Sequence, residues 1–219
     1  MRNRAEIVRR LTDPGLIAVI RTSNTAQVLP ICEALLAGGI HALEITLTVP
    51  NALDAIRQAS AQLGSRAVVG AGTVLNGASA QEVIGAGAQF VVSPITRLEI
   101  ITAAHRQDIP AMIGAYTPTE AQSAYEAGAD FIKLFPADKL GAGYVKSLLA
   151  PLPHLRIVPT GGVDLKTALD LLNAGCAALG VGSSLLTQDI LRREDWTALT
   201  QAAREFVELV RSRKKPGLD

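Results

Sequence analysis

Residues 42–74 read ALEITLTVPNALDAIRQASAQLGSRAVVGAGTV, and this stretch decides the fold class. Its two ends, ALEITL (42–47) and AVVGAGTV (67–74), are short runs with the composition of β-strands. Between them, NALDAIRQASAQLG (51–64) is rich in alanine and repeats its apolar residues with a helical period. A strand, a helix and a second strand in this order predict two parallel strands joined by a helical crossover.

The same alternation extends outward from this stretch to both ends of the chain. The eight predicted strands are LIAVIR (16–21), ALEITL (42–47), AVVGAGTV (67–74), FVVSP (90–94), PAMIGAY (110–116), FIKLFP (131–136), RIVPTGG (156–162) and ALGVGS (178–183). The predicted helices include residues 25–38, 51–64, 119–128, 165–175 and 196–213. An Ala-Gly pair ends a helix before a strand at Gly38, Gly87, Gly128 and Gly175, where we expect a left-handed glycine.

Eight strand–helix units predict an α/β fold, a closed (β/α)₈ TIM barrel, with a short N-terminal helix ahead of the first strand. No linker composition divides the chain, so residues 1–219 are interpreted as a single barrel domain. An open doubly wound sheet is the structural alternative. The nearest match to its nucleotide-binding glycine motif, Gly70-Ala-Gly72, lacks the third glycine.

Composition excludes several classes of partner. Lys and Arg number 21 against 20 Asp and Glu, a net charge of +1, so we expect neither nucleic acid nor a membrane surface to be bound. Two cysteines, Cys32 and Cys176, lie in apolar stretches, which is typical of reduced thiols and predicts a cytoplasmic protein. No targeting segment or membrane span is expected, because no apolar run reaches about 18 residues.

Lys133 is the residue that most clearly indicates chemistry. It lies inside a predicted strand, where alternation places it on one face with Phe131 and Phe135. That face points into the barrel, where a low dielectric disfavours the ammonium ion and favours the free amine. A free amine is the nucleophile that forms a Schiff base with a carbonyl. The alternative is a lysine that extends from the strand end to solvent.

Glu44, Thr46 and Thr48 form a second set of inward-facing polar side chains. Three polar groups on the core face of a strand are costly unless they line a polar site. A buried carboxyl there can shuttle protons. The alternative is a structural salt bridge, with Lys133 as one candidate partner.

Glycine-containing turns follow the last two predicted strands, at Gly161-Gly162 and at Gly182-Ser183-Ser184. Barrels of this kind often hold a phosphate on the loops after strands seven and eight, where backbone N–H groups converge. Arg21 and Thr73 end the first and third strands, at the rim where barrel active sites form. His41, His105 and His154 are scattered, so no metal site is expected.

Taken together, these motifs resemble the class I 2-keto-3-deoxy-6-phosphogluconate (KDPG) aldolases, a family that includes 2-keto-4-hydroxyglutarate (KHG) aldolases. The motifs are LEITLTVP (43–50), VGAGTVL (69–75), GAQFVVSP (87–94), TPTE (117–120), FIKLFPA (131–137), VPTGGV (158–163) and GVGSSL (180–185).

The resemblance implies a role for each matched residue. Lys133 matches the Schiff-base lysine, Glu44 the general acid/base and Thr73 a contact to the pyruvyl carboxylate. Gly161, Gly162, Gly182 and Ser183 match the phosphate site, and Pro94 and Thr48 fall at substrate-binding positions. The resemblance further implies a homotrimer that binds a small 2-keto acid phosphate and uses neither metal nor cofactor.

Two positions depart from the family pattern. Many members carry a carboxylate-binding arginine four residues after the catalytic glutamate, where this chain has Thr48; Arg21, on the neighbouring strand, is the expected substitute. Many also carry Pro-Gly near the end of strand five, where this chain reads Ile113-Gly114 followed by Tyr116. The aldehyde partner therefore stays open.

The predicted reaction is cleavage of KDPG to pyruvate and glyceraldehyde 3-phosphate. The same lysine could instead serve a KHG aldolase, an aldolase for the galactonate epimer of KDPG, or an oxaloacetate decarboxylase. A phosphosugar isomerase without a lysine adduct and a phosphometabolite-binding protein are the alternatives from other classes.

Overall fold

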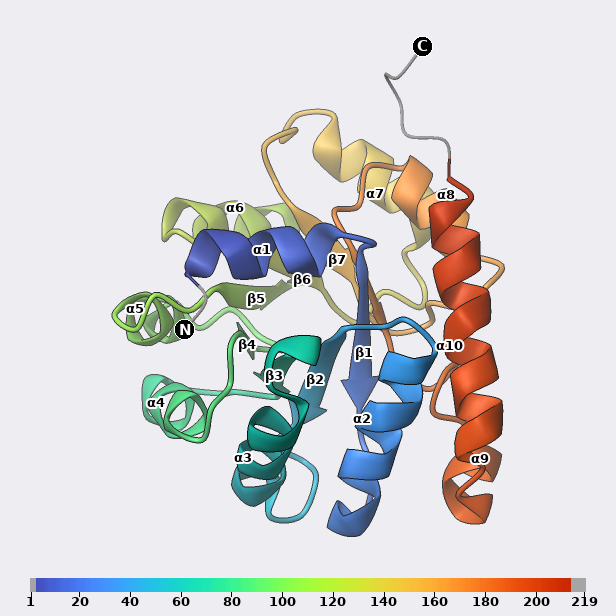
Figure 1. Ribbon diagram of the computed structural model, residues 1–219. Coiled ribbons are helices and arrows are strands. Elements are labelled where there is room, and N and C mark those ends of the chain that lie inside the picture. Colours follow the sequence, from blue (N-terminus) through green and yellow to red (C-terminus); the bar gives the residue numbers. More distant parts are fainter. Residues whose placement is uncertain (1–2, 214–219) are drawn as a thin grey trace.

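Eight parallel strands curl around a common axis in the computed structural model, which describes residues 3–213 (Figure 1). They are β1 (Leu16–Ile20), β2 (Ala42–Thr46), β3 (Val68–Gly72), β4 (Val91–Val92), β5 (Ala111–Ala115), β6 (Phe131–Leu134), β7 (Ile157–Pro159) and β8 (Leu179–Val181). Consecutive strands pair from β1 to β7, and β8 pairs with β1. A bridge between Thr160 and Gly180 joins the remaining edges. The TIM barrel is thus confirmed, and the open sheet is excluded.

All eight predicted strands are present, each shorter than its predicted range. Every strand residue is buried, as expected of parallel strands that pack on side chains inside the barrel and on helices outside it. The register keeps the predicted faces, because Glu44 pairs with Val19 and Gly70, and Lys133 pairs with Gly114 and Val158. Those residues all point into the barrel, whereas Leu43, Ile45, Ile132 and Leu134 pack outward.

Helices surround the strands and shield their outer face (Figure 1). They are α2 (Val28–Ala37), α3 (Ala52–Leu63), α4 (Gly77–Gly85), α5 (Glu99–His105), α6 (Pro118–Glu126), α7 (Gly141–Leu149), α8 (Ala168–Asn173), α9 (Gln188–Arg193) and α10 (Trp196–Arg211). Every one of these helices except α9 buries apolar residues; in α10 they are Leu199, Ala203, Phe206, Val207 and Val210. In α6, Thr117 and Glu120 form a reciprocal capping box that begins the helix.

The glycines at the helix ends correct one prediction. Gly87, Gly128 and Gly175 have φ of 103°, 98° and 108°, as expected, but Gly38 is right-handed with φ of −82°. The left-handed residue there is Gly39, with φ of 92°. Gly38 occupies the position that alanine holds in the other repeats, and α10 explains why a glycine stands there. A Cβ on Gly38 would collide with the Ala203 side chain.

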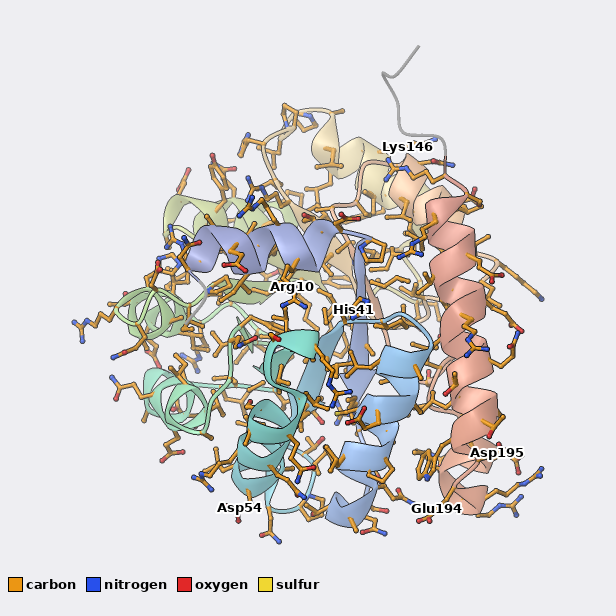
Figure 2. The ribbon with its side chains drawn as sticks, viewed as in Figure 1. Arg10, His41, Asp54, Lys146, Glu194 and Asp195 are labelled. Carbon is orange, nitrogen blue, oxygen red and sulfur yellow. The ribbon has the colours of Figure 1, made fainter. Side chains whose placement is uncertain are left out.

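The predicted N-terminal helix is α1 (Arg4–Thr12), and it lies across the end of the barrel where the strands begin (Figure 1). Its Arg4 Nε lies 3.5 Å from Asp130 Oδ1, just before β6, and its Arg10 guanidinium donates to the Ser65 and Arg66 carbonyls before β3. Figure 2 shows Arg10 and His41 at this end. Within residues 3–213, no helix has both the length and the apolar character to cross a membrane.

Candidate active site

Lys133 and Glu44 meet inside the barrel. The Lys133 Nζ donates to Glu44 Oε1 at 3.3 Å, and the two residues are only 5% and 2% exposed. Lysine on β6 and glutamate on β2 are separated by β3, β4 and β5 in one direction and by β1, β8 and β7 in the other. The two side chains therefore reach toward each other from opposite walls, and only closure of the barrel brings them together.

Gly72 on β3 makes room for the Glu44 carboxylate. Gly72 and Thr46 are register partners, so Gly72 faces inward two residues beyond the partner of Glu44. A Cβ on Gly72 would collide with Glu44 Oε1 and would lie 2.6 Å from its carboxyl carbon. The glycine thus holds open the space in which the carboxylate contacts the lysine.

A cavity of about 260 Å³ opens from Lys133 toward the rim where the strands end. Of the sequence-predicted site residues, it is lined by Arg21, Thr73, Pro94, Lys133, Gly161, Gly162, Gly182 and Ser183. Glu44 does not line this cavity itself and is connected to it only through its contact with Lys133. A buried ion pair that served stability alone would not need an empty cavity beside it, because side chains that packed into that space would add contacts. This opening favours the catalytic interpretation of the pair over the purely structural one.

Two backbone turns line the cavity beyond the ends of β7 and β8. Gly161 and Gly162 follow β7 with φ of 91° and 71°, values that favour glycine. Ser183 follows β8 and faces the cavity with an exposed side chain. Ser184, which the sequence also offered as a donor, instead donates its hydroxyl to the Val163 carbonyl at 2.6 Å. This hydrogen bond links the turn after β8 to the turn after β7.

Thr73 lies at the end of β3 in the left-handed region, with φ of 61°. A β-branched residue is uncommon in this conformation, and such backbone strain clusters at functional sites. The strained residue borders the cavity together with Pro94. Both observations agree with a role for Thr73 in holding a ligand.

Arg21 and Thr48 lie side by side, where the Arg21 Nη1 donates to Thr48 Oγ1 at 2.9 Å. Arg21 also borders a second, outer cavity of about 920 Å³, to which Thr48, Asn24 and Arg192 contribute. Thr48 lines this outer cavity and not the inner one, so the prediction that it faces into the barrel beside Glu44 is wrong. The reason is that β2 ends at Thr46, and strand alternation does not continue beyond it.

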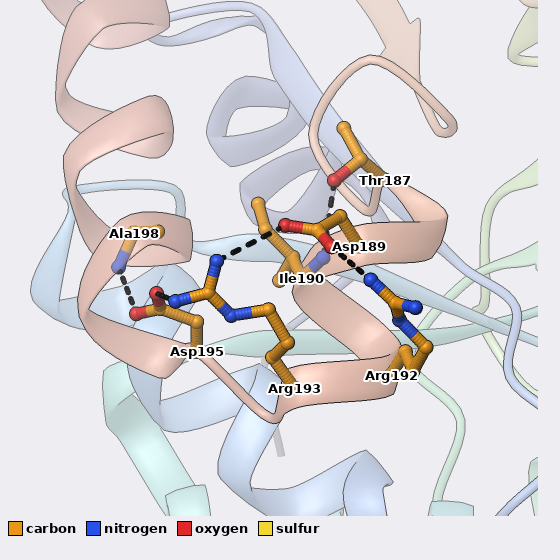
Figure 3. Close-up of polar contacts among 7 residues, drawn as sticks. All are labelled: Thr187, Asp189, Ile190, Arg192, Arg193, Asp195 and Ala198. Carbon is orange, nitrogen blue, oxygen red and sulfur yellow. Dashed lines mark hydrogen bonds and ion pairs between the residues drawn. The ribbon is translucent and has the colours of Figure 1, made fainter.

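The short helix α9 separates the two cavities, with Gln188 and Leu191 lining both. Its charged residues are paired with one another (Figure 3): Asp189 accepts from Arg192 at 2.7 Å and from Arg193 at 3.4 Å. Arg192 is therefore paired with a carboxylate. Arg21, by contrast, has no carboxylate partner among residues 3–213, which leaves its charge for an anionic ligand.

Several lining residues were not predicted as site residues. Phe135, whose ring centroid lies 5.5 Å from the Lys133 Nζ, shares the inward face with that lysine, so strand alternation could have identified it. Thr160 could be identified in the same way, two residues beyond Val158 on β7. Gln188 and Leu191 carried no signal, because no sequence pattern shows that α9 folds over the barrel rim.

The histidines and cysteines lie away from this cavity. His41 faces the Arg66 carbonyl, His105 contacts Asp130 at 3.0 Å and His154 contacts Gln122 at 2.9 Å. Within the described part of the chain, no three His, Cys, Asp or Glu side chains gather as metal ligands would. Both cysteines are free and buried, and desolvation raises the pKa of each thiol to about 12.

Comparison with known proteins gives a consistent result. Residues 7–202 match the aldolase family described as KDPG and KHG aldolase. The chain is 37% identical over 201 residues to the KHG/KDPG aldolase of Escherichia coli (strain K12), covering 90% of this chain and 93% of that relative. It is 35% identical over 194 residues to the 2-dehydro-3-deoxy-phosphogluconate aldolase of Pseudomonas aeruginosa, covering 88% of each. A crystal structure of the KDPG aldolase from Legionella pneumophila, with pyruvate captured as a covalent carbinolamine, superposes with a TM-score of 0.83 at 29% identity, covering 90% and 96% of the two chains.

Proposed function

The chain belongs to the KDPG and KHG aldolase family, and from this premise we propose how its own residues cleave KDPG into pyruvate and glyceraldehyde 3-phosphate. The enzyme is a class I aldolase, a carbon–carbon lyase. The observation that carries the assignment of its residues is the buried 3.3 Å contact between Lys133 Nζ and Glu44 Oε1 at the closed end of a cavity.

Lys133 is the proposed nucleophile. Its neutral amine adds to the C2 ketone of the substrate, and the carbinolamine takes up one proton and loses water to leave a protonated imine. That proton is released again when the imine is hydrolysed at the end of the cycle. The positively charged nitrogen accepts the electron pair of the C3–C4 bond when that bond breaks. Because the imine is itself the electron sink, the step as written uses no metal or cofactor.

Glu44 is the proposed proton shuttle. Its carboxylate takes the C4 hydroxyl proton, directly or through one water, as the bond breaks and the aldehyde forms. The enamine left on Lys133 is then protonated at C3, and water hydrolyses the resulting imine to pyruvate and free lysine. The water lost in forming the imine is thus recovered, and the enzyme returns to its starting state.

The two ends of the substrate are held on opposite sides of the reacting bond. The Gly161-Gly162 and Gly182-Ser183 turns offer backbone N–H groups and a hydroxyl to the phosphate. Arg21 and Thr73 are proposed to take the carboxylate, with Arg21 in place of the arginine that many relatives carry at the position of Thr48. Binding both ends fixes the C3–C4 bond between the lysine and the glutamate.

Borohydride trapping with pyruvate tests this assignment. We expect a reduced pyruvyl adduct on Lys133, located by peptide mass spectrometry across residues 131–137. Lys133→Ala should lose the adduct, whereas the matched control Lys139→Ala should keep it, since Lys139 is an exposed lysine of the same segment. Glu44→Gln should form the adduct but turn over slowly. No adduct in folded protein would reject the Schiff-base mechanism.

A KHG aldolase activity is the second candidate function. The relative from Escherichia coli that is 37% identical carries both activities in its name. The Gly161-Gly162 and Gly182-Ser183 turns favour the phosphorylated substrate, because a short dicarboxylic keto acid would leave these turns without a ligand group. Comparing kcat/KM for KDPG, for its galactonate epimer and for 4-hydroxy-2-oxoglutarate decides the preference.

We also propose that the protein is a homotrimer, as the family resemblance implies. Four exposed apolar side chains support association: Leu75, Ile95, Leu98 and Tyr116 are 48%, 42%, 43% and 44% exposed, on three consecutive loops of the catalytic rim. Light scattering should give three times the chain mass, and Ile95→Asp should lower it. A monomer in the unsubstituted protein would contradict this proposal.

A cytoplasmic location is proposed on the state of the cysteines. Both are free and buried, as is common in a reducing compartment. Cell fractionation with an antibody against the chain tests it.

A further inference from the structure

Arg21 is tied to the barrel by a continuous path of hydrogen bonds through two threonines. Its Nη1 donates to Thr48 Oγ1 at 2.9 Å, and the Thr48 and Thr46 hydroxyl oxygens lie 2.8 Å apart. The Thr46 hydroxyl in turn donates to the Ile20 carbonyl at 3.1 Å. The path therefore leads from the guanidinium back to the backbone of the residue that precedes Arg21.

The direction of every bond in this path is determined by the chemistry of its ends. A guanidinium only donates, and a backbone carbonyl only accepts. Thr46 has a single hydroxyl hydrogen and uses it on Ile20, so the Thr48 hydroxyl must donate to Thr46. Each hydroxyl then donates one bond and accepts one, which is the arrangement in which neighbouring bonds strengthen each other.

The path also relates Arg21 to Glu44. Thr46 is 1% exposed and lies on β2, two residues after Glu44 and on the same inward face. The strand that carries the glutamate therefore also holds the arginine, through rigid and buried backbone. Within residues 3–213 the guanidinium makes no other hydrogen bond, so its remaining N–H groups are available to a ligand.

We propose that Thr46 and Thr48 are positioning residues that orient the Arg21 guanidinium toward the substrate carboxylate. The inference deepens the proposed function and rests on it, since it concerns how this chain binds the acid end of a 2-keto acid. Thr48 thus acts through Arg21 at the position where many relatives carry an arginine. The preference for ligands that carry a charged carboxylate therefore depends on Thr46 and Thr48 as well as on Arg21.

Two trapping ligands separate this role from a merely structural one. Pyruvate carries the carboxylate and methyl pyruvate does not, while both present the same ketone to Lys133. The measured quantity is the ligand concentration that gives half-maximal borohydride trapping. We expect Thr46→Val to raise it about fivefold for pyruvate, the weakening that one lost hydrogen bond of ordinary net strength produces, and to leave methyl pyruvate unchanged.

Companion variants complete the test. Thr46→Ser keeps the hydroxyl and should restore pyruvate binding, and Thr48→Val, at an exposed position, should repeat the loss without burdening the fold. Thr200→Val is the matched control, because it removes a hydroxyl that donates to the Ala34 carbonyl at 3.0 Å on the outer helices. In an Arg21→Ala background, Thr46→Val should have no further effect.

The outcomes distinguish this inference from the proposed function. Equal losses for pyruvate and methyl pyruvate, or an additive effect in the Arg21→Ala background, would overturn the positioning role while the Lys133 adduct still forms. Absence of any Lys133 adduct in the unsubstituted protein would overturn the aldolase mechanism, and this inference with it. Loss confined to pyruvate in both threonine-to-valine variants supports it.

Discussion

Two levels of the barrel interior, marked by Gly70 and Gly72 on β3, contain different kinds of side chain. An aromatic ring fills the lower level, and a buried charged pair fills the upper level. At the lower level Gly70 makes room for the ring of Phe90, and a Cβ there would collide with it. At the upper level Gly72 makes room for the Glu44 carboxylate in the same way. Glycine on an inward-facing position therefore creates space at both levels. The neighbour that fills the space decides whether the level serves stability or chemistry.

The two levels differ in what their burial contributes to folding. Phe90 and Phe131 are each 1% exposed, and full burial of such a side chain stabilises a fold by roughly 1.5–3 kcal/mol. Glu44 and Lys133 are almost as deeply buried, but desolvation of two charges offsets most of their attraction. The upper level thus gains little stability from its ion pair, which is consistent with a catalytic role for it.

The strongest test of this contrast removes the ion pair altogether. Lys133→Met combined with Glu44→Leu should abolish turnover, because the nucleophile is gone, and should leave stability unchanged or raise it by about 1–4 kcal/mol. Lys133→Met alone should destabilise the fold, since the glutamate is left buried without its partner. Turnover assays and urea unfolding check both expectations. A double variant much less stable than wild type would show that the pair is structural.

Phe90→Ala probes the lower level. The cavity left by the ring should lower the free energy of unfolding by about 3–5 kcal/mol, whereas kcat per folded molecule should stay close to wild type. Denaturant unfolding monitored by circular dichroism measures the loss. Leu165→Ala, an exposed apolar residue outside the loops proposed for association, is the control and should change stability by no more than about 0.5 kcal/mol. A large fall in kcat for Phe90→Ala would mean that the two levels are coupled.

Gly72→Ala sharpens the contrast at the upper level. The new methyl group displaces the Glu44 carboxylate, and a shift of this size should slow proton transfer by about 100-fold while Lys133 still forms its imine. Deuterium exchange at C3 of pyruvate reports proton transfer, and borohydride trapping reports the imine. If both fall equally, Glu44 serves imine formation as well.

The smallest expected effect concerns the two buried thiols, Cys32 on α2 and Cys176 in the loop between α8 and β8. Burial raises each thiol pKa to about 12 from an unfolded value of 9.0, so both thiols stay neutral in the folded protein. Their contribution to stability is full below pH 9 and is lost as pH rises toward 12. A thiol reagent at pH 8 should therefore react only after unfolding. Rapid labelling of native protein would contradict the burial of these residues.

Much of this organisation could be predicted from local sequence patterns. The alternation of strand side chains correctly placed Lys133 and Glu44 inside the barrel, and the turns after the last two strands were predicted to line the site. The same rule failed at Thr48, which lies beyond the last residue of β2 and follows the path of a loop. A different rule, that the glycine past a helix end is left-handed, failed at Gly38, where a neighbouring helix and not the helix end requires a glycine.

What the sequence by itself determined is the order of elements, the face on which each strand residue lies and the chemical type of the groups inside, because these depend on neighbours within a few residues. Tertiary structure alone decided which inward groups meet. Lys133 and Glu44 come from opposite walls, and Arg21, which follows β1, reaches Thr48, which follows the neighbouring strand β2. Such contacts require closure of the barrel and the exact register between strands, which no local pattern encodes. The position of α9 over the rim likewise depends on tertiary packing, and no local pattern in its sequence predicts it.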